Sequence, residues 1–105
     1  MKRMLVLACV ALSACGVGTS GTCSTTSTLT WESFGQSFMT TNCTSCHGAT
    51  NASDGVSLTS AALVRAHLNK VDAEVASGSM PPRGSTALTT QQKSDLANWL
   101  ACGAP

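Results

Sequence analysis

The sequence predicts an all-α domain of three to five short helices. Apolar residues recur at helical spacing in three stretches, capping residues precede each stretch, and no stretch alternates with the period of two that strands require. The chain has 105 residues, which is one domain at most. A domain of roughly 75–90 residues is marginally stable unless a disulfide, a metal or a cofactor supplements its core.

The first helix is expected to begin after Thr28 or Thr30, either of which can cap it, and to lead into Cys43. Four apolar side chains share one face of this helix: Trp31, Phe34, Phe38 and Met39. The small, polar and Gly-punctuated stretch 48–56 that follows is typical of a loop.

A second helical stretch is expected to begin at Thr59 or Ser60 and to break near Asn69 into two short helices. Gly78 ends it. A last helix, capped by one of the threonines at 89–90, runs to about residue 101.

Residues 1–14 are typical of a secretory signal, with a positive start and an apolar run too short to span a bilayer. The segment Leu12–Cys15 is similar to the lipobox of bacterial lipoproteins, so we expect Cys15 to carry a lipid anchor. A plain thiol at this position is the alternative. Gly16 replaces the aspartate that retains lipoproteins in the inner membrane, which favours the outer membrane.

Residues 15–28 are rich in Gly, Ser and Thr, which predicts a flexible tether before a domain over 29–105. Without residues 1–14, four basic and five acidic side chains leave a net charge of −1. No basic patch indicates nucleic acid as a partner, and docking to a protein should depend only weakly on salt. We expect a monomer.

Cys43 and Cys46 stand three positions apart, and His47 follows directly. In this spacing the two thiols can add to the vinyl groups of a haem while the histidine coordinates its iron. Three other interpretations lack a required part. A thioredoxin-type pair needs a βαβ context, a structural zinc needs four ligands, and a disulfide between the two cysteines leaves His47 unexplained. The motif therefore predicts one covalent haem c.

Three further elements complete a resemblance to the class I cytochromes c over about 29–105. In that family a glycine eight residues before the first haem cysteine allows two helices to cross closely, and Gly35 has this position. The last helix of the family carries a Leu-x-x-aromatic-Leu pattern, which 96–100 matches. The family's second iron ligand is a methionine, often followed by proline, as Met80 is. The resemblance implies helices wrapped around the haem, with His47 and Met80 as iron ligands.

The chain departs from the family pattern at two points. The family usually has a proline about a dozen residues after the ligand histidine, whose carbonyl accepts the Nδ1–H bond, and 51–60 holds none. A backbone carbonyl near Val56 or Leu58 must take that role. Phe38 lies one position off the family's aromatic residue, so the first helix is expected to pack slightly differently.

Met39 and His67 are the rivals of Met80 for iron. Met39 lies too close before Cys43 to reach across the ring, whereas His67 could bind if its helix faced that side. A thioether favours ferrous iron, so ligation by Met80 predicts a potential in the upper part of the range that axial ligands command.

The remaining assignments follow from the implied fold. Cys23 and Cys102 flank the first and last helices, which cross in this family, so we expect a disulfide, with free thiols as the alternative. Arg83 follows the Met-Pro-Pro turn and can pair with a haem propionate, although a solvated arginine is the alternative. Trp99 and Trp31 are expected to pack against haem, with an indole N–H reaching a propionate.

The predicted function is single-electron transfer, because iron bound by two protein ligands has no open position for a substrate. We expect no enzymatic activity, and transient docking of redox partner proteins at the haem edge near Cys46. The protein is expected to be exported and lipid-anchored in the periplasm. A haem-based gas sensor, in which a gas displaces Met80, and an electron-entry subunit of a periplasmic oxidoreductase complex are the alternatives.

Overall fold

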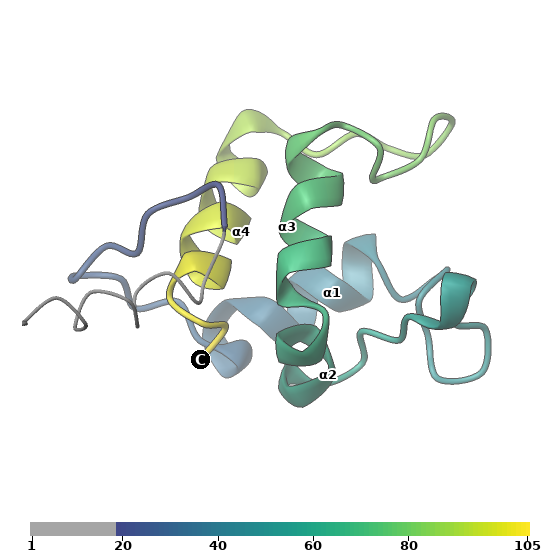
Figure 1. Cartoon of the computed structure of the whole chain (residues 1–105), viewed down its shortest axis with the longest axis horizontal. Helices are drawn as coiled ribbons and strands as arrows, with labels where there is room; N and C mark the ends of the chain where they lie inside the picture. Colours follow the sequence, from purple (N-terminus) through teal and green to yellow (C-terminus); the bar gives the residue numbers. More distant parts are fainter. Residues whose placement is uncertain (1–18) are drawn as a thin grey trace, which may run out of the picture.

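The computed structural model describes residues 19–105, and four α-helices without a β-strand make up the regular structure of that range (Figure 1). The helices are α1 (Gln36–Asn42), α2 (Ala61–Ala66), α3 (Leu68–Ala76) and α4 (Thr90–Ala101), with a π-helical turn η2 (Trp31–Gly35) and a 3-10 turn η3 (Ser53–Gly55). The predicted all-α fold is confirmed. The predicted signal over 1–14 and Cys15 lie outside the described residues.

None of the helices within residues 19–105 has the length and apolar character needed to cross a membrane.

The first helix begins at Thr30 through a reciprocal cap. The Ser33 amide donates to the Thr30 hydroxyl at 3.0 Å, and the Thr30 amide donates to the Ser33 hydroxyl at 2.9 Å. The Gly35 amide then donates to the Thr30 carbonyl at 2.9 Å, which makes the first turn π-helical.

The second helical stretch is divided into two helices, as predicted. Ser60 caps α2, because its hydroxyl accepts the Leu63 amide at 3.1 Å. The break falls at His67, whose φ is −119°. This is two residues before Asn69, where the break was predicted. At the end of α3, Gly78 has a φ of +87°, a left-handed conformation that glycine adopts without strain, and the chain turns away from the helix.

The last helix, α4, also begins with a reciprocal cap and ends in a left-handed glycine. The Gln92 amide donates to the Thr89 hydroxyl at 3.1 Å, and the Gln92 side chain accepts the Thr89 amide at 2.8 Å. Gly103, with φ +90°, turns the chain back so that the Ala104 amide donates to the Trp99 carbonyl at 2.9 Å. The end of the chain is therefore held against α4.

The crossing of η2 with α4 is built around Trp99, whose side chain is fully buried. The Trp31 ring stacks on it at 6.4 Å between centroids, and the Phe34 ring meets it edge-on at 5.6 Å. A Cβ added to Gly35 would lie 2.6 Å from Cζ2 of Trp99. The glycine thus permits the close helix contact that the family resemblance implies.

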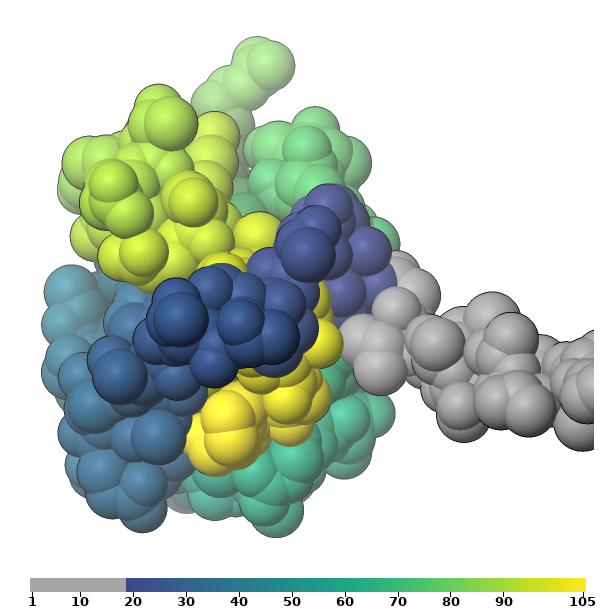
Figure 2. Space-filling view, turned by 90° about the vertical axis from the view of Figure 1, so that its left-hand side faces the viewer, coloured from purple at the N-terminus to yellow at the C-terminus, as the bar shows by residue number. Residues whose placement is uncertain are grey.

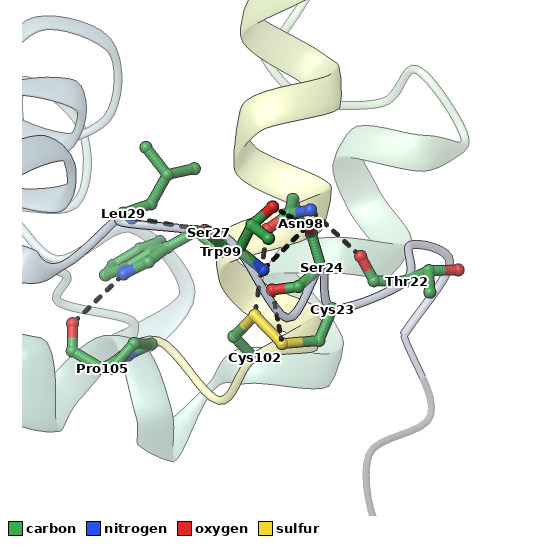
Figure 3. Close-up of a disulfide and its surroundings, with 10 residues drawn as sticks. Thr22, Cys23, Ser24, Ser27, Leu29, Asn98, Trp99, Cys102 and Pro105 are labelled. Atoms are coloured by element: carbon green, nitrogen blue, oxygen red, sulfur yellow. Dashed lines mark hydrogen bonds between the residues drawn. A yellow bond between two sulfur atoms is a disulfide. The ribbon is translucent and has the colours of Figure 1, made fainter.

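Residues 19–28, here called the N-terminal strap, lie across α4 and the end of the chain (Figure 2). Cys23 forms a disulfide with Cys102, directly after α4 (Figure 3). The side-chain amide of Asn98 donates to the Thr22 carbonyl at 3.1 Å. The strap is therefore joined to α4 by one covalent bond and by hydrogen bonding.

Asp72 of α3 holds the strap at a second point. The Ser20 amide and hydroxyl donate to its two carboxylate oxygens at 2.7 and 2.9 Å, and Asp72 is only 6% exposed. Of the tether expected over 15–28, the strap is therefore held against the domain from Ser20 onward, and residues 15–18 lie outside the described residues. Small residues suit this close packing, since a Cβ on Gly21 would lie 2.6 Å from a backbone oxygen of α4.

Candidate functional site

A cavity lies between α1, α3 and the loops that follow them. It is partly open to solvent, and its wall includes residues from Phe38 to Leu96. Most of its wall is apolar, with side chains from all parts of the domain: Phe38, Val56, Leu58, Val71, Val75, Leu88 and Leu96. Such a wall suits a large, flat and mainly apolar group.

Cys43, Cys46 and His47 all line this cavity, directly after α1. The amides of Cys46 and His47 both donate to the Cys43 carbonyl, at 3.2 and 2.9 Å, so the backbone makes one tight turn here. Both thiols are free. The groups that covalent haem attachment requires are therefore present together at an apolar pocket, and the residues fit the cofactor.

The competing zinc interpretation lacks its ligands. Within residues 19–105, no three His, Cys, Asp or Glu side chains gather closely enough to hold a metal ion. A structural zinc needs four such ligands.

The two cysteines differ in their surroundings. Burial raises the pKa of the Cys43 thiol to about 11, so this thiol is neutral at physiological pH. A thioether carries no ionisable proton, so carbon–sulfur attachment at Cys43 suits this buried position. Cys46 is exposed, which places the second attachment point at the open edge of the cavity.

The ring of His47 is oriented by the backbone of Val56. Its Nδ1 lies 2.8 Å from the Val56 carbonyl oxygen. A carbonyl can only accept, so Nδ1 carries the proton and Nε2 keeps a free lone pair for iron. Val56, one of the two residues whose backbone carbonyl was expected to accept this hydrogen bond, thus takes the role of the missing proline.

Backbone links on both sides of Val56 hold its carbonyl in place. The Ser53 amide donates to the Cys46 carbonyl at 2.8 Å, and the Leu58 amide donates to the His47 carbonyl at 2.9 Å. Between them the η3 turn contains Gly55 with φ +74°, where a left-handed residue is needed. The loop therefore folds back onto the attachment motif and returns the Val56 carbonyl to the histidine.

Of the three side chains considered as second iron ligand, Met80 lines the cavity of His47, whereas Met39 and His67 do not. Met39 is fully buried in the helix core. His67 lies at the junction of α2 and α3.

The structure places Arg83, Trp99 and Trp31 away from the cavity wall. Arg83 is exposed to solvent. The indole N–H of Trp99 donates to the Pro105 carbonyl at 3.2 Å (Figure 3). The Trp99 ring packs against Trp31 in the helix crossing. The two tryptophans thus fill the contact between helices. The predicted roles of Arg83, Trp99 and Trp31 at a haem stay predictions.

The sequence analysis did not single out the two charged residues of α3 that line the cavity. Lys70 and Glu74 both line the cavity. They stand four positions apart on α3 and directly precede Val71 and Val75, so all four belong to one helical face. Their helical spacing beside two apolar residues could have indicated, from the sequence alone, that they share the cavity-facing side of α3. The Lys70 ammonium group can pair with an acidic group of a bound cofactor.

The helical fold and an apolar cavity that carries a Cys-x-x-Cys-His motif define a c-type cytochrome. The family model described as cytochrome c oxidase, cbb3-type, subunit III matches residues 33–100. This is more than half of the chain, and the chain therefore belongs to that cytochrome c family. No curated protein and no solved structure matches it. The protein is thus a haem-based electron carrier with covalently bound haem c, and it exchanges electrons with redox partners.

Proposed function

We propose that this protein is a single-electron carrier of the bacterial cell envelope, with His47 and Met80 as the axial ligands of one haem c. The observation that carries the proposal is that these two side chains line one cavity, whereas Met39 and His67 lie elsewhere. The sequence contains a single Cys-x-x-Cys-His motif, which supports one haem.

The residues of the site suit outer-sphere electron transfer. When bound, haem supplies an iron that gains or loses one electron. The Val56 carbonyl keeps the His47 ring in one tautomer, and the apolar wall limits the water that must reorient when the charge changes. With both His47 and Met80 bound to iron, a substrate finds no open position. We therefore propose that the protein is not an enzyme.

The location in the envelope rests on the sequence before the described domain. The signal-like residues 1–14 and the lipobox-like Leu12–Cys15 support export and a lipid anchor at Cys15, in the periplasm and with preference for the outer membrane. Exposed Cys46 supports transient docking of redox partners at the adjacent open edge. The low net charge supports docking that depends weakly on salt.

Replacement of the proposed second ligand tests the proposal. Met80→Ala, exported in a host with haem-attachment machinery, should retain haem by mass. It should lose the weak far-red iron–sulfur absorption and bind carbon monoxide rapidly when reduced. Met39→Leu is the control, because Met39 is buried in the core, and it should keep the wild-type spectrum. An unchanged spectrum in Met80→Ala would exclude this ligand, and rapid carbon monoxide binding by reduced wild type at neutral pH would favour a gas sensor.

A second candidate follows from the family match, because that family is described by a subunit of an oxidase. In this case the protein is the electron-entry subunit of a larger periplasmic oxidoreductase complex. Size-exclusion chromatography of a mild detergent extract of native membranes, followed by haem absorbance, distinguishes a free carrier from a subunit. A carrier elutes as a small species, and a subunit elutes with its complex.

A further inference from the structure

Glu74 lies in the last turn of α3, where carbonyl groups lack partners within the helix. The Gly78 amide, four positions after Glu74, donates to the Val75 carbonyl at 3.1 Å. The Glu74 carbonyl is therefore available to the chain beyond the helix. The Met80 amide donates to it at 3.0 Å. The backbone of Met80 is therefore joined to the helix that forms one wall of the cavity.

Ser79 adds a side-chain link to the same residue. Its hydroxyl lies 3.0 Å from Oε1 of Glu74 and 3.1 Å from the Glu74 carbonyl oxygen. One hydroxyl hydrogen is shared between these two acceptors, and the bond to the charged carboxylate is the stronger. The residue next to Met80 is thus held by a charge-assisted hydrogen bond.

Few other groups hold this part of the chain. Residues 79–88, here called the Met80 arm, are largely exposed. In the part of the chain that the structure describes, the hydrogen bonds that join residues 79–88 to the rest of the molecule end on Glu74 or Ser77. The Ser77 hydroxyl itself donates to the Glu74 carbonyl at 3.2 Å. The hydrogen bonds of the arm thus converge on one residue of α3.

We propose that Glu74 is a positioning residue that, through Ser79, keeps Met80 at the iron and resists its displacement by other ligands. This inference rests on the proposed ligation by His47 and Met80. When the link is lost, conformations with the arm displaced become more populated. The apparent affinity of an external ligand for the vacated position rises in proportion to that population.

Imidazole is the probe, titrated into the oxidised, haem-loaded full-length protein while the far-red band is followed. Ser79→Ala and Glu74→Ala should each bind imidazole roughly 3- to 10-fold more tightly than wild type, the effect of one lost hydrogen bond. Glu74→Gln should fall between wild type and Glu74→Ala, because its amide oxygen still accepts the Ser79 hydrogen but without the negative charge. Thr86→Ala is the matched control, since Thr86 is exposed on the same arm and lies outside the cavity wall.

Wild-type imidazole affinity in both Ser79→Ala and Glu74→Ala overturns the inference, even where their unfolding temperatures fall, because the link would then be structural only. An equal rise in Thr86→Ala also overturns it. Failure of the ligation itself is recognised separately. In that case the wild type lacks the far-red band, or Met80→Ala retains it.

Discussion

The N-terminal strap and the Met80 arm are both largely exposed segments outside the helices, and they extend on opposite sides of the molecule (Figure 1). The strap is fastened to two helices, by a disulfide to Cys102 after α4 and by two hydrogen bonds to buried Asp72 of α3. The arm is hydrogen-bonded to the end of α3, chiefly at Glu74. The covalent link thus lies on the side away from the arm.

This difference separates two properties of the protein. The strap and the helix crossing hold the scaffold together, so changes there should alter the free energy of unfolding and leave the iron ligands in place. The arm presents Met80 through hydrogen bonds that each contribute only about 1 kcal/mol. Changes in the arm should therefore alter ligand exchange and potential more than stability.

The largest effect is expected when the strap is released. The disulfide closes a loop with a sequence separation of 79, so a Cys23→Ser/Cys102→Ser double variant should lose about 4 kcal/mol of unfolding free energy by the chain-entropy model. Denaturant titration followed by circular dichroism measures this loss. The visible spectrum should stay that of wild type, because the disulfide does not touch the cavity wall.

Reduced wild type is the control for the double variant, since dithiothreitol should produce a similar shift in the denaturation midpoint. A double variant as stable as wild type would show that the disulfide contributes nothing to the stability of the scaffold. Loss of the far-red band would show that scaffold and ligand arm are not separable.

A smaller scaffold effect is expected at the helix crossing. Gly35→Ala places a carbon 2.6 Å from the fully buried Trp99 ring, and overpacking of this kind costs about 1–3 kcal/mol. Gly84→Ala in the arm is the comparison, because nothing lies within 4 Å of its added carbon. Its left-handed φ of +98° adds only backbone strain, about 1 kcal/mol. Thermal unfolding of both variants measures the difference. An equal fall in unfolding temperature for Gly35→Ala and Gly84→Ala would contradict it.

Local sequence signals predicted the helices and the attachment motif well. Threonine and serine caps fix where helices begin, and Thr30, Ser60 and Thr89 all serve as caps. The role of a carbonyl near Val56 was also predictable, because a ligand histidine needs a partner for Nδ1 within a short loop.

Tertiary packing decided the features that the sequence did not reveal. A Gly/Ser/Thr composition describes both a free tether and a segment packed on a helix, so the contact of Ser20 with Asp72 was not foreseeable. The helical period placed Trp31 and Trp99 on the apolar faces of their helices. It did not tell whether each one faces a cofactor or another helix, and the structure places both in the crossing.

The smallest effect is expected at the cavity, from the two charged side chains of α3 that line it. Lys70 and Glu74 line the cavity of the ligands, and a nearby positive charge disfavours ferric iron more than ferrous iron. Lys70→Gln should therefore lower the reduction potential, and Glu74→Gln should raise it, by roughly 20–50 mV at low salt with little change in stability. Lys93→Gln, on the exposed surface of α4, is the control and should shift the potential less. Spectroelectrochemical titration measures all three. Shifts of the same sign for Lys70→Gln and Glu74→Gln would mean that structural change in the arm, rather than charge at the cavity wall, sets the potential.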